Sequence, residues 1–224
     1  MTLFASYAGS RVTAGRITTS ASGAWVGDLM LADDSDVPTR GTLTIADLTL
    51  VGAVTRGGPF AGSRALRLVG GAGGWRNELP ALPYAKPQGV RLATVLGDAA
   101  AAVGERVVLS AAYATRVLGV AWVRARMPAS QVLALTVGRA WWVDPAGVTQ
   151  VGDRPTSAVI ASGFTVTNYQ HNLGLVTIAT ETLAPWQPGA TFRDVLLGTA
   201  PLTASSVTIA LDPRGKLRLE VLTT

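Results

Sequence analysis

The stretch WRNELPALPYAKPQGVRLATVLGDAAAAVGE, residues 75–105, decides how this chain is organised. Three prolines between residues 80 and 87 preclude a helix or an interior strand there, because proline fixes φ and has no N–H. Residues 90–103 then place apolar side chains three and four positions apart, which predicts an amphipathic helix ended by Gly104. The rest of the chain is patterned mostly as strands, so this stretch indicates an insert within a β protein.

Strand patterns lie on both sides of this stretch. Before it, about five strands are expected at hairpin spacing, within residues 11–20, 24–31, 42–57 and 64–71, with GGPFAGSR (57–64) as a turn cluster. After it, a short β-like run (106–114), a second helix (125–138) and a hairpin around DPAG (139–155) are expected. The last third predicts strands within residues 157–170, 173–183, 190–198 and 205–223, the final pair turning at DPRG.

These elements predict a mainly β (α+β) fold, in which an antiparallel β-barrel or sandwich domain carries a small inserted α+β domain. We place the first part of the β domain at residues 1–85, the insert at 86–156 and the returning strands at 157–224.

The composition is that of a globular protein. Of 224 residues, 48% are hydrophobic and 15% are charged, which excludes intrinsic disorder and leaves much uncharged surface for burial against partners. The net charge is +5, and nearly all of the cations are single, scattered arginines. Codon bias of a GC-rich genome explains this pattern, and a phosphate-binding surface explains it as well.

The sequence also bounds the environment of the protein. The absence of cysteine excludes disulfides and thiolate metal sites. No apolar stretch approaches the roughly 20 residues that span a bilayer, and no signal peptide is visible. We therefore expect a soluble protein, made in a cytoplasm and not inserted in a membrane.

Motifs for catalysis or cofactors are not found. GGAGGW (70–75) lacks the third glycine and the helix of a dinucleotide-binding loop, so it predicts only a backbone with positive φ or a close approach. His171 is the only histidine, and DDSD (33–36) lacks the glycine and glutamate of a calcium loop. We expect no catalytic residue, metal or cofactor, although a pair of carboxylates needs only spatial proximity and stays open.

Tryptophan is the most informative aromatic residue. Four of the six, Trp75, Trp141, Trp142 and Trp186, are candidate interface anchors, and core packing or a platform for sugars or single-stranded nucleic acid are the alternatives. Trp141 and Trp142 are adjacent in an expected strand, so their rings face opposite sides and cannot form one platform.

Three segments carry a resemblance to a known family. They are PQGVRLATVLGDAAAAVGE (87–105), MPASQVLALTVGRAWWVDPAGVTQVGDRP (127–155), and LAPWQPGATFRDVLL (183–197) followed by SSVTIALDPRGKLRLEVLT (205–223). In content and order they resemble the baseplate or tail-hub proteins of tailed bacteriophages and related injection machines, of the late-control-D type. GGAGGWRNELPALPYAKPQGV (70–90) also resembles the loop before the insert of such hubs.

The resemblance implies a structural role and no enzymatic activity. Such hubs have tube-like barrels, form rings that are usually trimers, and join the tail tube or a distal tail ring to a central spike or fibre. They line or close the channel through which phage DNA passes, in the tail tip of a virion assembled in the host bacterial cytoplasm. The chain is shorter than contractile-tail hubs, which have a further domain; it corresponds to a minimal hub or to a tail-tip protein whose spike is a separate chain.

On the hub interpretation, candidate channel-facing residues are the arginines near strand ends, Arg11, Arg16, Arg56 and Arg64, with a solvated rim as the alternative for each. Two other functions stay open: a β-rich module that binds carbohydrate or nucleic acid, and a cell-wall hydrolase.

Overall fold

The first strands close into an antiparallel barrel in the computed structural model, which describes residues 5–198 and 200–224. The barrel consists of β1 (Ala5–Tyr7), β2 (Ser10–Ser20), β3 (Val26–Leu31), β4 (Arg40–Ile45), β5 (Leu48–Phe60) and β6 (Ser63–Gly70). Their order is β1-β4-β5-β6-β3-β2, and β1 pairs with β2 to close it. Successive side chains of a strand face opposite sides, so the alternating apolar residues share one core.

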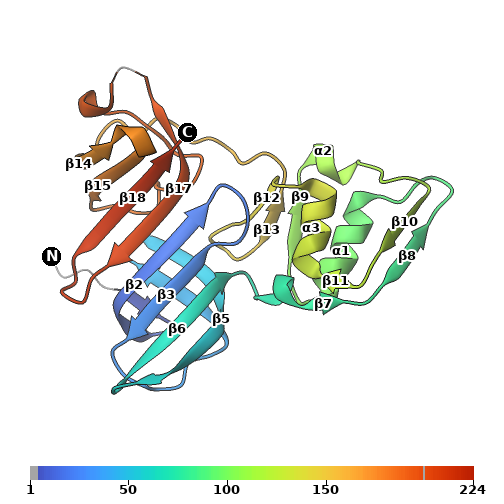
Figure 1. The fold of residues 1–224 in the computed structure, drawn as a ribbon, viewed down its shortest axis with the longest axis horizontal. Helices are drawn as coiled ribbons and strands as arrows, with labels where there is room; N and C mark the ends of the chain where they lie inside the picture. Colours follow the sequence, from blue (N-terminus) through green and yellow to red (C-terminus); the bar gives the residue numbers. More distant parts are fainter. Residues whose placement is uncertain (1–4, 199) are drawn as a thin grey trace.

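The returning strands extend the same sheet. They are β14 (Phe164–Gln170), β15 (Leu175–Thr180), β16 (Thr191–Phe192), β17 (Leu202–Leu211) and β18 (Leu217–Thr223). β17 pairs with the second half of β2, and the order continues as β17-β18-β15-β14 (Figure 1). One hydrophobic core serves the barrel and the returning strands, and it includes Trp186 and Phe192 in edge-to-face contact with Phe164.

The segment between these strands forms a separate α+β body to one side (Figure 1). It contains η1 (Gly74–Arg76), β7 (Glu78–Leu79), β8 (Leu82–Ala85), α1 (Leu92–Ala102), β9 (Val107–Leu109), α2 (Ala111–Ala114), β10 (Ala121–Arg124), β11 (Met127–Pro128), α3 (Ala129–Val137), β12 (Trp141–Val143) and β13 (Thr149–Val151). Helices α1 and α3 pack together over a second hydrophobic core, whose buried residues run from Trp75 to Val151.

The end of α1 fixes the loop that leaves the barrel. Gly104 has a φ of 72°, and the amides of Gly104 and Glu105 donate to Ala101 and Ala100, which is the Schellman way of ending a helix. This turn buries the Glu105 side chain, whose carboxylate accepts from the amides of Ala72 at 3.0 Å and Gly74 at 2.7 Å. The barrel exit is therefore hydrogen-bonded to the α+β body.

The hairpin of β12 and β13 makes the second attachment. The amide of Gly23, in the turn between β2 and β3, donates to the carbonyl of Trp141 at 2.8 Å, and Val51 donates to Pro145 at 2.8 Å. The Trp141 ring packs against both hydrophobic cores, and its centroid is 6.5 Å from that of Trp75. The two bodies thus share backbone hydrogen bonds and one aromatic side chain.

Most expected elements are present. The mainly β fold with an antiparallel barrel is confirmed, as are the helix in 90–103, the helix in 125–138 and the hairpin around DPAG. The positive φ expected in GGAGGW occurs at Gly71 and Gly73. At Gly74 a Cβ would overlap the Val103 carbonyl, which is the close approach expected there.

Four expectations were wrong in detail. The turn cluster at 57–64 is mostly strand, because Pro59 lies where β5 has a neighbour on one side only and needs no N–H for pairing. The loop at 80–87 contains β8, for the same reason, since β8 pairs with β10 alone. The run at 106–114 ends in α2, and in 190–198 only Thr191–Phe192 is strand.

Candidate functional site

Strand register places arginines in one row on the outer face of the sheet. Direct pairings connect Arg218 to Ala210, Ala210 to Arg16, Arg16 to Asp28, Asp28 to Arg67 and Arg67 to Arg56, across β18, β17, β2, β3, β6 and β5. The neighbouring positions along these strands, such as Ile17, Leu29 and Leu66, are buried. We call these six residues the arginine row; they face away from the core because side chains alternate along a strand.

The arginine row carries a positive excess. Glu220 accepts from both Arg16 and Arg218 at 3.0 Å, and Asp28 accepts from Arg67 at 2.6 Å. Arg56 has no ion-pair partner among the described residues. Four guanidinium groups thus face two carboxylates. The side chains of Arg16, Arg67 and Arg218 are about half exposed.

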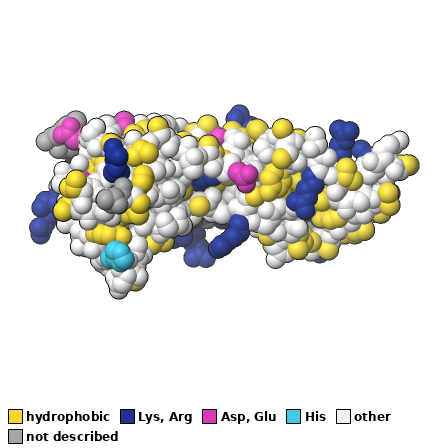
Figure 2. All heavy atoms as spheres, turned by 90° about the horizontal axis from the view of Figure 1, so that it is seen from above, with side chains coloured by type: hydrophobic (Ala, Val, Ile, Leu, Met, Phe, Trp, Pro, Cys, Tyr) yellow, Lys and Arg dark blue, Asp and Glu magenta, His cyan; other side chains and the backbone are white. Residues whose placement is uncertain are grey.

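Basic side chains also lie elsewhere on the molecule. Figure 2 shows Lys and Arg side chains along both bodies on the face that it presents. A row that follows from strand pairing is a stronger indication of a surface for an anionic partner than isolated surface arginines, because neighbouring cations add their fields.

The four arginines predicted from the sequence lie in different settings. Arg16 and Arg56 belong to the arginine row. Arg64 is engaged by the acidic loop at residues 33–36, because it donates to the Asp34 carbonyl at 2.8 Å and to the Asp36 carboxylate at 2.7 Å. Arg11 is exposed and pairs with β1, outside the row. Whether any of the four faces a channel stays a prediction.

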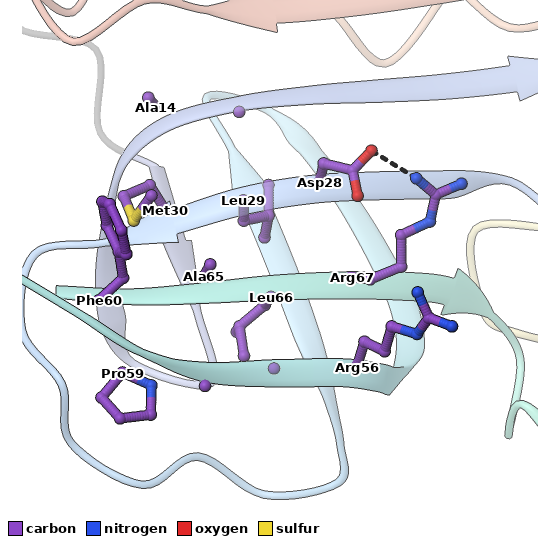
Figure 3. Close-up of a pocket in the computed structure, with 13 residues that line it drawn as sticks. Ala14, Asp28, Leu29, Met30, Arg56, Pro59, Phe60, Ala65, Leu66 and Arg67 are labelled. Carbon is purple, nitrogen blue, oxygen red and sulfur yellow. Dashed lines mark hydrogen bonds and ion pairs between the residues drawn. The ribbon is translucent and has the colours of Figure 1, made fainter.

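An apolar groove of about 720 Å³ adjoins the row on the same face. We call it the β5 groove; its lining includes Ala14, Met30, Gly58, Phe60, Ala65 and Arg56. Strand register again places four of these residues side by side across β2, β3, β6 and β5: Ala14 pairs with Met30, Met30 with Ala65, and Ala65 with Gly58. Figure 3 shows Phe60 and Met30 at one end of the groove and the guanidinium groups of Arg56 and Arg67 at the other.

The four candidate tryptophans divide into two pairs. Trp75 and Trp186 are 5% and 1% exposed, so their rings pack in the interior of this chain. The Trp75 indole N–H donates to the Thr149 hydroxyl at 2.7 Å. Trp141 and Trp142 are half-buried, as the opposite-face argument allows, and they keep the interface prediction open.

Arg154 is held at the side of Trp142. Its guanidinium lies 5.4 Å from the indole centroid and donates to the Ser20 carbonyl at 2.9 Å. Burial lowers the pKa of Arg154 to about 10. This arginine therefore has a structural role between the β12–β13 hairpin and β2.

The described residues contain no group of three His, Cys, Asp or Glu side chains able to hold a metal ion. Within those residues, no helix is both long and apolar enough to cross a membrane.

Sequence reasoning missed Arg67, Arg218 and Glu105. The alternation in residues 64–70 and 217–223 marks both arginines as outward-facing, but only the strand order reveals that they lie in one row. Glu105 carried no signal beyond its place after Gly104, because its partners lie about 30 residues earlier.

Comparison with known proteins identifies the fold. No protein-family model and no curated protein matches the chain. A tail protein from Neisseria meningitidis MC58 matches 100% of this chain and 97% of its own, with a TM-score of 0.66 and 16% identity. The 43 kDa tail protein of prophage MuSo2 from Shewanella oneidensis matches 98% of this chain and 97% of its own, with a TM-score of 0.66 and 11% identity.

A third structure comes from a secretion machine. The c3393 protein of E. coli, a component of the type VI secretion system that is structurally similar to the T4 tail proteins gp27 and gp5, matches 98% of this chain and 76% of its own. The TM-score is 0.67 and the identity 12%. The chain therefore has the fold of bacteriophage tail proteins and of a related secretion-system component.

Proposed function

We propose that the chain is a structural, non-catalytic component of a bacteriophage tail tip or baseplate. In this role it is a hub that joins the tail tube, or a distal tail ring, to a central spike or fibre, and lines or closes the DNA channel. The α+β body, which contains residues 86–151 together with η1, β7 and β8, acts as an inserted domain outside the tube. The fold shared with tail proteins supports the setting, and the arginine row is the observation that carries the proposal.

The sheet is suited to ring formation. Eight strands follow one another from β14 to β5, and each end keeps an edge that no described strand covers. At one end β14 pairs only with β15, and at the other end residues 56–60 of β5 pair only with β6. Two different edges on one chain support head-to-tail association, which closes into a ring when the rotation between copies allows it. The resemblance to tail hubs favours three copies.

In such a ring the arginine row would face the channel. A surface with a modest positive excess attracts passing phosphates, and its partial neutralisation by Glu220 and Asp28 limits how tightly they bind. This combination suits transient passage of DNA better than stable storage.

The first test is the native mass of the purified chain by light scattering across a range of concentrations, with electron microscopy of the same sample. We expect a ring of defined mass with a central opening. A chain that is monomeric throughout and does not associate with isolated tail tubes would contradict the proposal.

The second test addresses the channel. The variant Arg16→Gln with Arg218→Gln removes two charges of the row that lie outside the β5 groove. The variant Arg106→Gln with Arg139→Gln removes two exposed arginines of the α+β body. We expect the first variant to change the kinetics of DNA ejection from assembled particles and the second to leave them unchanged. Equal kinetics in wild type and both variants would exclude the arginine row from the channel.

A further inference from the structure

The β5 groove is an exposed apolar surface with a polar end. Phe60 is 66% exposed at the tip of the β5–β6 hairpin, and Met30 and Ala65 lie beside it. The volume of about 720 Å³ falls within the range of about 300–1,000 Å³ that holds compact ligands, so two aliphatic side chains fit. Such a surface on an isolated chain calls for an occupant.

The most exposed of the described large hydrophobic residues, Val195, forms a projection with its neighbour Leu196 elsewhere on the same chain. Val195 and Leu196 are 93% and 68% exposed within η3 (Val195–Leu197), a single helical turn between β16 and β17. The Asp194 carboxylate accepts from the Leu196 amide at 2.9 Å and so holds this turn in shape. We call residues 193–198 the apolar loop.

The apolar loop cannot reach the groove of its own chain. The turn at Val195–Leu197 lies at one end of the β body and the β5–β6 hairpin at the opposite end (Figure 1). The loop follows β16, whose Phe192 contacts Phe164 at the start of β14, whereas the groove lies on the β5 edge. An occupant from this sequence must therefore come from a second copy.

Charges at the two surfaces are complementary. Asp194 precedes the two aliphatic residues, and the groove contains Arg56; neither has an ion-pair partner among the described residues. Arg193 in the apolar loop and Asp28 in the groove form a second pair of opposite charge, in which Asp28 already accepts from Arg67. Complementary charges attract the two surfaces to each other and also fix the orientation in which they meet.

We propose that Val195 and Leu196 of one copy insert into the β5 groove of the next, with Asp194 directed at Arg56. The contact joins two different surfaces, so it is head-to-tail and has the polarity that a ring requires. The inference rests on the self-association part of the proposed function and adds the surfaces that determine it.

Disulfide crosslinking tests the contact directly, because the chain has no cysteine of its own. Val195→Cys and Ala65→Cys proteins are mixed under mild oxidation. We expect a covalent dimer in the mixture, in excess of any dimer formed by either variant alone. The control pairs Ala65→Cys with Leu173→Cys, which places a thiol on another exposed turn, 57% exposed in the native chain.

A second pair of variants measures the energetic role. Val195→Asp with Leu196→Asp should weaken association in light scattering at least about tenfold, as expected for central apolar anchors, whereas Leu173→Asp should not. Oligomers without the specific crosslink, or oligomers unaffected by the double substitution, would overturn this contact and leave the hub proposal standing. A monomer at every concentration with no crosslink would overturn this contact, and it would overturn the hub proposal as well if the chain also fails to associate with isolated tail tubes.

Discussion

Glu105 offers a direct test of how the two bodies are joined. Its side chain is 6% exposed and accepts from the amides of Ala72 and Gly74. Replacing it by alanine leaves both amides without this acceptor, at about 1–3 kcal/mol each for a buried group. The Ala72 residue is only half-buried and can recruit water, so we expect Glu105→Ala to lower the free energy of unfolding by about 2–4 kcal/mol.

Glu105→Gln should cost less, because the amide oxygen still accepts one of the two bonds while its NH₂ faces the other donor. The assay is urea unfolding followed by tryptophan fluorescence, in which Glu105→Ala lowers the midpoint by about 1–2 M at a slope of about 2 kcal/mol/M. Amide hydrogen exchange adds a local measurement, since Ala72 and Gly74 should exchange faster. The matched control is Glu181→Ala, which removes an exposed carboxylate.

The result that would refute this reasoning is specific. Ordinary surface substitutions change the free energy of unfolding by no more than about 0.5 kcal/mol. If Glu105→Ala changes it by no more than that, and both amides keep their exchange rates, then the carboxylate does not fix the loop. The attachment would then depend on the β12–β13 hairpin alone.

Three further predictions concern other parts of the chain. Trp186→Ala should lower the free energy of unfolding by about 3–5 kcal/mol, because it empties the centre of an aromatic cluster; calorimetry measures it, and a loss under about 1 kcal/mol would contradict the packing. Arg154→Met should destabilise by about 1–2 kcal/mol, through a charge-assisted hydrogen bond and a cation–π contact; an unchanged urea midpoint would show that the burial of this charge offsets both. Burial raises the pKa of Tyr7 above its ordinary 10.0; the unfolded chain therefore releases this proton first, and stability falls as pH rises above about 10. The decline in urea midpoint from pH 9 to pH 11 should be smaller in Tyr7→Phe, and equal declines would contradict the assignment.

Local patterns were sufficient for the elements whose signals lie within a few residues. The helix α1 was predictable because its apolar face and its terminal glycine are both local, and the turns at DPAG and DPRG have residues suited to tight turns. The extent of β5 was not, because Gly57, Gly58 and Pro59 disfavour strand locally. Pairing with β6 overrides that preference, as tertiary contacts often do for weak local propensities.

The candidate site was predictable only in part. Arg16 and Arg56 were named from their places near strand ends, and both lie in the arginine row. Arg64 was named on the same grounds, but the acidic loop folds back and engages it. Alternation along a strand tells which residues are outward-facing; it does not tell which groups from elsewhere in the chain come to meet them.

The sequence by itself determined the β character of the chain, the helix-containing insert and the outward positions of the arginines, because alternation, helical spacing and turn residues are properties of neighbouring positions. Only the tertiary structure decided the strand order, and with it the arginine row, the β5 groove and the hydrogen bonds of Glu105. The Arg16–Glu220 pair illustrates the physical reason, since 204 positions separate its members in the sequence. Such pairs depend on the register of the whole sheet, which is fixed by the packing of one shared core and not by any local stretch.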